Sequence, residues 1–497
     1  MTADITLLNL NMLYLRYYES LDRERHVPLG PLYLTRAIED AGMTVDFRDY
    51  QFNEYDDPFS LDSALDFLSG SSRVIGISVM ANLLPFAVLL ARRIKEAWPG
   101  KTVVLGGVGP KAVEAAILQR FPEIDLIAYG EGERTGPQIV ACLTSGGDLS
   151  RCPGIFYRDG ETVVQTAHSG RLADLGSQPY PAYEKTDLSR YTAIGMMTSR
   201  GCPFPCTFCS VAPVWDFTPV LRTAEDIVGE MRHVLERSST NLFLFQDEYF
   251  LASPARAKEL CRVLGESGLA VRWKAFGRVN LTDRESMELM ARSGCLELRF
   301  GIESGSDEIL SRVRKGFTVT EATDVISSAA SIFPGVDACF IWGFPFETME
   351  HFYQTLFLMN GYRMMGVRVL PSLLCYLPQT AVYNELDKSK LEFSHETVPE
   401  YMVTGHESFR GAAIEIRREH GHIYDFIVAH PDIFPGFFQY DVANNVRPKL
   451  AALTEFGFYG RPSADEATES CGAHSTITRA TSVRATTAAS SLRSCGR

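Results

Sequence analysis

Short apolar runs alternate with helical patterns along the first 150 residues. The apolar runs are ITLLNLN, TVDFRDY, VIGISVM, TVVLGG and DLIAYGEGE, and helical periodicity marks segments such as PFAVLLARRIKEAW and AVEAAILQRF. Alternation of this kind predicts a parallel sheet with helices on both faces, since parallel strands need crossover connections. We therefore expect a doubly wound, Rossmann-like α/β domain over residues 1–150, with ligands at the carboxyl edge of its sheet.

A second series of strand and helix patterns starts near residue 193. Its candidate strands are AIGMMTS, NLFLFQD, VRWKAF, LELRFGI, VDACFIWG and GVRVLPSLL, most of them followed by a helical pattern. Six such units predict a (β/α)6 partial TIM barrel over residues 191–380, with its chemistry at the carboxyl ends of the strands. Residues 151–190 are rich in Pro, Tyr and Gly, which favours a small hairpin and a linker.

The pattern loosens after the barrel. Residues 381–461 form a mixed region that we expect to cap the barrel mouth and shape substrate specificity. Residues 462–497 shift to Ser, Thr, Ala and Arg with almost no large apolar side chain. That composition predicts a disordered tail.

Charge and composition narrow the class of protein. The chain of 497 residues has a formal net charge of −13 and no basic cluster, which argues against nucleic-acid binding. The start lacks a basic segment ahead of its apolar run, and no stretch is long and apolar enough to span a bilayer. Eleven cysteines, an odd number, do not form a disulfide framework, so we expect a cytoplasmic protein in a reducing compartment.

Three of these cysteines carry the strongest chemical signal. The segment SRGCPFPCTFCS places Cys202, Cys206 and Cys209 on a loop after the first barrel strand, where Pro203 and Pro205 oppose a helix. Structural zinc usually takes four protein ligands, whereas three thiolates on a cubane iron-sulfur cluster leave one iron open for a small molecule. A zinc knuckle or chance cysteines remain the alternative interpretation.

The CxxxCxxC spacing, with Phe208 before the last cysteine, resembles that of the radical S-adenosylmethionine (SAM) enzymes. The resemblance implies that Cys202, Cys206 and Cys209 ligate a 4Fe-4S cluster whose open iron chelates SAM. It further implies that one electron, from an external donor such as flavodoxin or ferredoxin, cleaves SAM to a 5′-deoxyadenosyl radical.

The resemblance covers most of residues 190–380 and implies further SAM contacts. The candidates are Phe208, Asp247 and Glu248 after the second strand, Arg278 after the third, Glu303 and Ser304 in GIESGSD, and Ile341 and Gly343 in FIWGFP. The alternatives are that Asp247 and Glu248 cap the next helix and that Arg278 is a surface residue.

The N-terminal domain resembles the cobalamin-binding domain of the cobalamin-dependent radical SAM class. Ser78 and the pair Gly106 and Gly107 look like the serine and double-glycine elements, and Gly130 with Glu131 closes the domain in AYGEGE. No DxHxxG element follows the first strand, so we expect a cobalt without a protein imidazole, and His26 is a weak candidate for an axial ligand.

Together these resemblances imply a methyltransferase that acts on an unactivated carbon, or a phosphorus, of a small metabolite in antibiotic-type natural-product biosynthesis. Oxidative cyclisation or ring rearrangement without methyl transfer is one alternative. A non-catalytic cluster or zinc protein whose sheet domain binds a partner is another. No residue is singled out as catalytic.

Overall fold

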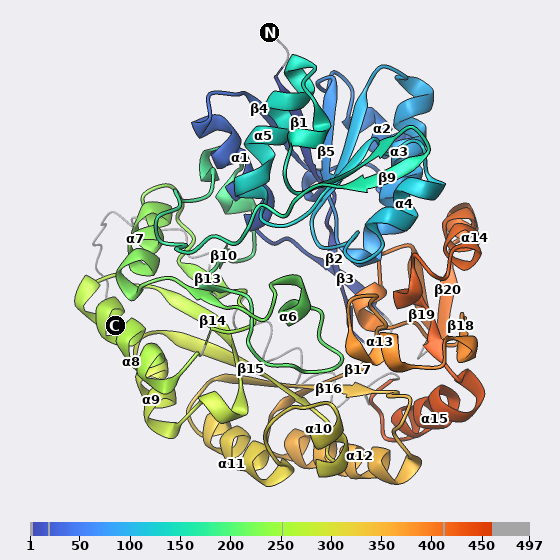
Figure 1. Ribbon diagram of the computed structural model, residues 1–497. Coiled ribbons are helices and arrows are strands. Elements are labelled where there is room, and N and C mark those ends of the chain that lie inside the picture. Colours follow the sequence, from blue (N-terminus) through green and yellow to red (C-terminus); the bar gives the residue numbers. More distant parts are fainter. Residues whose placement is uncertain (1–2, 18–19, 251, 411–412, 460–497) are drawn as a thin grey trace, which may run out of the picture.

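The computed structural model describes residues 3–17, 20–250, 252–410 and 413–459. They form an N-terminal α/β domain, a curved half-barrel and a C-terminal segment that lies against both (Figure 1). The tail predicted over residues 462–497 lies outside the described residues. In the described ranges, no helix has the length and apolar character that crossing a membrane requires.

The N-terminal domain is built on a seven-stranded sheet. In spatial order its strands are β4 (Val45–Asp49), β1 (Ile5–Asn9), β5 (Val74–Ser78), β6 (Thr102–Gly106), β7 (Leu126–Ala128), β8 (Ile155–Asp159) and β9 (Thr162–Gln165). The first five are parallel and follow the chain order 2-1-3-4-5, which confirms the doubly wound arrangement. The hairpin predicted after residue 150 is β8–β9, and it extends this sheet in antiparallel fashion.

Helices cover both faces of this sheet. The helices α1 (Leu29–Asp40) and α5 (Gly132–Ser145) pack on one face, and α2 (Leu61–Phe67), α3 (Leu84–Ala97) and α4 (Glu114–Arg120) pack on the other. The central strand β5 is buried along almost its whole length, as expected for a parallel strand with helices above and below.

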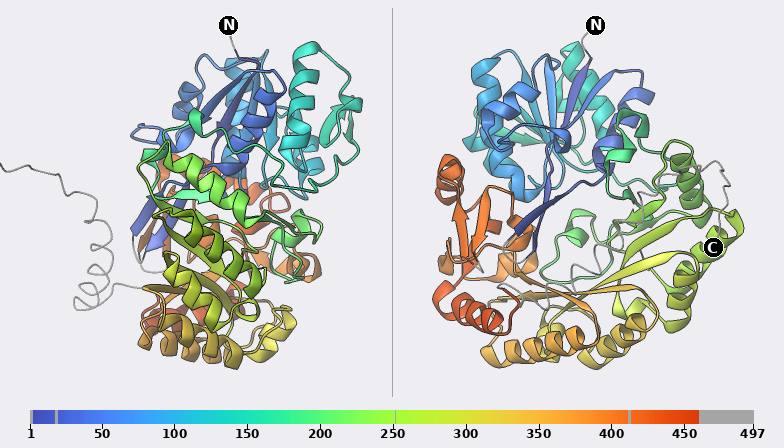
Figure 2. Two further views of the ribbon diagram at one scale, coloured as in Figure 1. Left: turned by 90° about the vertical axis from the view of Figure 1, so that its left-hand side faces the viewer. Right: turned by 180° about the vertical axis from the view of Figure 1, so that it is seen from behind.

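The half-barrel has six parallel strands, as the sequence predicts. They are β10 (Ile194–Met196), β13 (Leu242–Phe245), β14 (Arg272–Gly277), β15 (Cys295–Glu303), β16 (Gly335–Trp342) and β17 (Arg368–Leu373). The outer helices are α7 (Ala224–Leu235), α8 (Pro254–Ser267), α9 (Arg284–Arg292), α10 (Asp307–Arg312), α11 (Val319–Ala330) and α12 (Met349–Met364). Figure 2 shows them as a layer outside the curved sheet.

Side-chain alternation along the strands separates a packed face from an open one. In β15, Leu298, Phe300 and Ile302 are buried against the helices, whereas Glu297 and Arg299 are only partly buried on the concave face. The concave face is therefore the polar interior of the half-barrel.

The N-terminal domain also reaches the edge of the half-barrel. After the hairpin β2 (Leu13–Tyr17) and β3 (Ser20–Glu24), His26 forms a parallel bridge with Ala193, just before β10. Its two imidazole nitrogens lie 3.0 Å from Glu24 Oε2 and 3.1 Å from Gln246 Nε2. Both nitrogens of His26 therefore have protein partners.

The C-terminal segment contains α13 (Ala381–Glu385), β18 (Leu391–Glu392), β19 (Glu407–Arg410), β20 (Ala413–Ile416), α14 (Gly421–Ala429), β21 (Gln439–Tyr440), the π-helix Val442–Val446 and α15 (Arg447–Glu455). Its side chains Phe434, Phe437 and Phe438 join the apolar core of the N-terminal domain around α3 and α4. On its other side, α15 contacts α12 of the half-barrel.

A buried ion pair attaches α15 to the half-barrel. Lys449 Nζ lies 2.9 Å from Glu347 Oε2, and the two side chains are 1% and 0% exposed. Burial raises the pKa of Glu347 and lowers that of Lys449, while each group stabilises the charge of the other.

We expect Lys449→Met to lower the free energy of unfolding by about 3–5 kcal/mol, because it leaves the Glu347 carboxylate enclosed without its cation. Urea denaturation followed by tryptophan fluorescence measures the change. Lys258→Met is the matched control, since Lys258 pairs with the exposed Glu285, and it should change the free energy of unfolding far less. Equal losses in the two variants would contradict this expectation.

Candidate functional site

The three cysteines lie on a loop between β11 (Ser199–Arg200) and the short helix α6 (Val211–Val214). Figure 1 shows α6 in front of the concave face of the half-barrel. Cys202 is buried, and Cys206 and Cys209 are half-buried. The loop thus follows the first barrel strand, as expected.

Asp247, two residues after the end of β13, holds the chain that leads into this loop. It is 2% exposed and accepts hydrogen bonds from the backbone N–H of Thr198 at 2.7 Å and of Ser199 at 3.2 Å, and from the Thr198 hydroxyl. Burial raises the pKa of Asp247 to about 7, and these hydrogen bonds act against that rise. The carboxylate is therefore enclosed behind the cysteine loop.

The surroundings of the sulfurs suit thiolate ligands. Burial raises the pKa of Cys202, and raises that of Cys209 to about 11, whereas backbone N–H groups lower both. Arg278 Nη1 lies 3.8 Å from Cys206 Sγ. Amide and cationic donors beside sulfur are what an iron-sulfur cluster needs, so the donor set fits such a cluster. Within the described chain, however, no three Cys, His, Asp or Glu side chains already converge on one metal position.

Several predicted SAM residues lie together beside the loop. Phe208 contacts Phe344 at a ring-centroid distance of 6.0 Å, and Ile341 belongs to the same apolar cluster. Lys315 Nζ lies 5.7 Å from the centroid of the Phe208 ring and 2.6 Å from Glu303 Oε1. These side chains form an apolar wall beside the Lys315–Glu303 ion pair, at the carboxyl end of β15.

Other predicted SAM residues differ in their exposure. Glu248 is exposed, and its charge acts on Cys202, so it lies near the cluster loop. Ser304 is fully buried, and its hydroxyl lies 3.1 Å from Thr355 Oγ1. Gly343 has φ of +87°, and its N–H donates to Glu347 Oε2 at 2.9 Å.

The predicted cobalamin residues end three neighbouring strands of the first sheet. Ser78 ends β5, Gly106 ends β6 with Gly107 directly after it, and Gly130 follows β7. Gly107 has φ of +86°, and a Cβ there would lie 2.7 Å from the Val79 carbonyl oxygen, so the edge requires glycine. Met80 and Val108 are 48% and 44% exposed beside it. At this edge two backbone segments approach each other closely and apolar side chains are exposed. Such a surface fits the flat corrin ring of cobalamin.

A buried ion cluster joins this edge to the cysteine loop. The Glu131 side chain is 0% exposed and lies 3.2 Å from Arg200 Nη1 and 3.3 Å from Arg171 Nε. Arg200 also pairs with Glu133 at 2.7 Å, and both guanidinium groups lie over the Trp215 ring. Glu131 follows Gly130, and Arg200 precedes Cys202 by two residues. The ion cluster therefore connects the sheet edge at Gly130 to the cysteine loop.

Sequence reasoning did not single out Arg171, Arg200 or Lys315. Arg200 stands inside the quoted cysteine segment, and Lys315 follows the GIESGSD segment closely. Their positions beside the motifs were the only sequence signal that could have identified Arg200 and Lys315. The sequence did not show which carboxylates they pair with.

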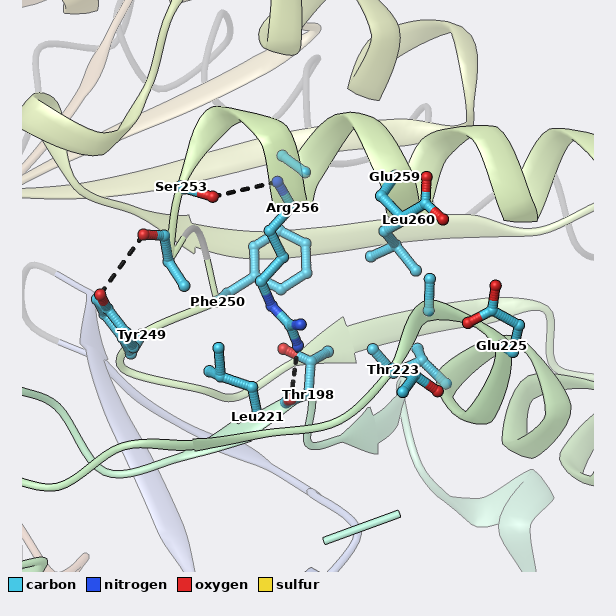
Figure 3. A pocket seen from close by; sticks show the side chains of 14 residues that line it. Thr198, Leu221, Thr223, Glu225, Tyr249, Phe250, Ser253, Arg256, Glu259 and Leu260 are labelled. Atoms are coloured by element: carbon cyan, nitrogen blue, oxygen red, sulfur yellow. Dashed lines mark hydrogen bonds between the residues drawn. The ribbon is translucent and has the colours of Figure 1, made fainter. Parts of the chain in front are cut away.

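A cavity of about 470 Å³ lies on the helix side of the half-barrel, between α7 and α8 (Figure 3). Figure 3 shows Arg256 crossing it to the Thr198 carbonyl oxygen, at 2.9 Å. The cavity therefore borders the back of the peptide that precedes the cysteines, away from the concave face.

Comparison with known proteins assigns the two domains. Residues 23–140 match the B12 binding domain, and residues 196–359 match the radical SAM superfamily. An uncharacterized methyltransferase of Pyrococcus horikoshii is 28% identical over 57% of this chain and 63% of its own length. An anaerobic magnesium-protoporphyrin IX monomethyl ester cyclase of Synechocystis sp. is 26% identical over 60% of each chain.

Among solved structures, the fold is similar to that of the radical SAM methyltransferase TsrM from Kitasatospora setae, with a TM-score of 0.64 and 17% identity. That match covers 96% of this chain and 98% of TsrM, whereas the two curated relatives are matched over less than two thirds of their lengths. With a B12 binding domain followed by a radical SAM domain, the chain belongs to the cobalamin-dependent radical SAM enzymes, whose cofactors are a 4Fe-4S cluster, SAM and cobalamin.

Proposed function

We propose that the protein methylates an unactivated carbon, or a phosphorus, of a small metabolite. The observation that carries the proposal is the Glu131–Arg200 ion pair, which joins the edge expected to bind cobalamin to the loop expected to bind the cluster. A radical formed on substrate in the half-barrel would then lie close to the edge that would hold the methyl donor. Similarity to a protein named as a methyltransferase supports this function.

Each set of residues has a role in this proposal. Cys202, Cys206 and Cys209 would hold the cluster; Phe208, Glu248, Arg278, Glu303, Ile341 and Gly343 would border SAM; Ser78, Gly106, Gly107 and Gly130 would border cobalamin. The bound cofactors supply a 5′-deoxyadenosyl radical and a methyl group. The enclosed side chains of Glu131, Asp247 and Ser304 are positioning groups, because each is occupied by protein partners.

The role of the half-barrel is to orient the substrate and to exclude water from the radical. We further propose an external electron donor such as flavodoxin or ferredoxin, and a substrate from natural-product biosynthesis. Similarity to an enzyme named as a cyclase favours a second candidate function, oxidative cyclisation without methyl transfer.

Isotope labelling separates these two functions without knowledge of the substrate. The reconstituted enzyme, given reductant and SAM with a labelled methyl group, should transfer the label to cobalamin, which mass spectrometry of the recovered cofactor detects. Cys206→Ala should lose iron and 5′-deoxyadenosine formation together. Unlabelled cobalamin alongside abundant 5′-deoxyadenosine would overturn methyl transfer and favour cyclisation.

The role proposed for Asp247 predicts a specific defect. Asp247→Asn keeps the Oδ1 acceptor of the Thr198 and Ser199 N–H groups but replaces the Oδ2 acceptor of the Thr198 hydroxyl by an NH2 donor, so the cysteine loop should loosen and the iron content per chain should fall. Iron analysis after reconstitution measures this, with the exposed Glu236→Gln as control. Full iron content with weakened SAM binding would instead make Asp247 a SAM ligand.

The ion cluster predicts a spectroscopic change. In Glu131→Gln the carboxylate charge that pairs with Arg171 and Arg200 is lost, so the cofactors should shift relative to one another. We expect an altered magnetic interaction between cob(II)alamin and the reduced cluster in electron paramagnetic resonance spectra.

Glu131→Asp keeps the charge and should restore part of the wild-type signal, while Glu161→Gln on the exposed β8–β9 turn should leave the signal unchanged. If Glu131→Gln binds both cofactors fully and gives the wild-type spectrum, the positioning role is refuted.

A further inference from the structure

Large apolar side chains are exposed on the outer face of α12. The described residues expose eleven such side chains, and five of them lie on α12 or beside its carboxyl end: Tyr353, Phe357, Met364, Met365 and Phe456. Phe357 and Met364 are 83% and 89% exposed, although the solvent side of a surface helix is usually polar. A contiguous apolar surface of this kind marks an interaction site.

The spacing of these residues places them in one stripe along the helix. The stripe consists of Tyr353, Phe357, Gly361 and Met364, at successive intervals of four, four and three residues. Such intervals bring side chains onto the same face of a helix. The other side of α12, where Leu356 lies, is buried in the core of the half-barrel.

Gly361 leaves a notch in this stripe. A Cβ at Gly361 would have no atom within 4 Å, so no contact inside the described chain requires a glycine there. In α7, by contrast, a Cβ at Gly229 would lie 2.7 Å from the Tyr180 hydroxyl oxygen. Glycine is unfavourable inside a helix, and a notch beside the exposed Phe357 suits the close approach of a second helix.

The stripe is complementary to itself in an antiparallel arrangement. Side chains on a helix lean toward its N-terminus. When two copies of α12 lie antiparallel about a two-fold axis at Phe357, each Phe357 ring leans toward Gly361 of the other copy. Tyr353 of one copy then lies beside Met364 of the other, which is a favourable contact between sulfur and an aromatic ring.

The charged residues at the two ends of α12 favour the same arrangement. The first turn carries Glu350, and the last turn carries Arg363. An antiparallel pair brings the first turn of each helix beside the last turn of the other, so opposite charges and opposite ends of the helix dipoles meet. A parallel pair would place Glu350 beside Glu350 of the second copy.

The tail of the chain offers little that could cover this surface. Residues 462–497 contain one Ile, one Val and one Leu, and no Phe, Tyr, Trp or Met. Covering exposed aromatic rings requires apolar area, which such a segment lacks. A second copy supplies this area, because the stripe is its own matching surface.

We propose that the protein forms a two-fold symmetric homodimer through the outer face of α12, with Phe357 of each copy seated over Gly361 of the other. Because α12 lies outside the curved sheet and away from the N-terminal domain, the concave face of each copy stays open in the dimer (Figure 1). One helix face per copy is a small interface, so we expect an equilibrium between monomer and dimer that depends on protein concentration. This inference does not rest on the proposed function.

Sedimentation velocity of the full-length holoenzyme, measured anaerobically at increasing protein concentration, tests the proposal. The wild-type protein should shift from monomer to dimer. Phe357→Glu should weaken association roughly tenfold or more, because it places a charge at the centre of the contact. Since Phe357 is exposed, the variant should keep its fold and iron content. Val428→Glu, at an exposed apolar position of α14, is the matched control and should leave association unchanged.

Gly361→Leu separates a specific contact from general adhesion of an apolar surface. Leucine favours the helix and adds apolar area, so it would strengthen a non-specific association. In the proposed dimer it fills the notch that receives Phe357, so association should weaken roughly tenfold or more. Gly265→Leu on α8, where a Cβ would likewise have no atom within 4 Å, should have no effect on association.

A wild-type protein that stays monomeric at every concentration would overturn the inference. So would a dimer that persists unchanged in Phe357→Glu, or stronger association in Gly361→Leu. Because sedimentation reports mass and not turnover, a positive result stands whichever reaction the labelling experiment supports.

Discussion

One enclosed carboxylate, that of Glu131, fixes the relation between the two cofactor-binding parts of the molecule. Enclosing a carboxylate costs several kcal/mol unless cations and N–H donors surround it, and here Arg171, Arg200 and the Leu172 N–H do so. The cost of separating these groups opposes a displacement of the domains, together with the His26–Ala193 bridge and the C-terminal segment that packs on both domains. A hydrophobic contact alone is non-directional and would let one domain shift along the other.

Polar residues at the strand ends divide into two groups. Glu248 and Arg278 face the cysteine loop, whereas Asp247 and Ser304 are turned into the protein and hold loops in place. The second group sets the shape of the site and the first its chemistry. Neighbours in sequence, such as Asp247 and Glu248, thus have different tasks, because the chain has left β13 at Phe245 and turns at Glu248.

The sequence was sufficient to predict the parallel strands of both sheets and the cysteine loop, because hydrophobic periodicity and motif spacing are local signals. It did not reveal that β8–β9 extends the first sheet, that His26 bridges to Ala193, or that Lys449 anchors α15 to Glu347. These contacts join residues far apart in the chain, and no local pattern encodes them. Glu131 was predicted beside cobalamin from its glycine neighbour, whereas the direction of its side chain depends on Arg200.

The apolar core shared by α3 and the C-terminal aromatic residues has a consequence for synthesis on the ribosome. Phe86 and Phe434 belong to one core, yet translation separates them by 348 residues, or roughly 20–70 s at ordinary elongation rates. During that interval the nascent first domain carries an uncovered apolar surface. Efficient production of the protein should therefore depend on chaperones that shield this surface until Phe434 and its aromatic neighbours emerge.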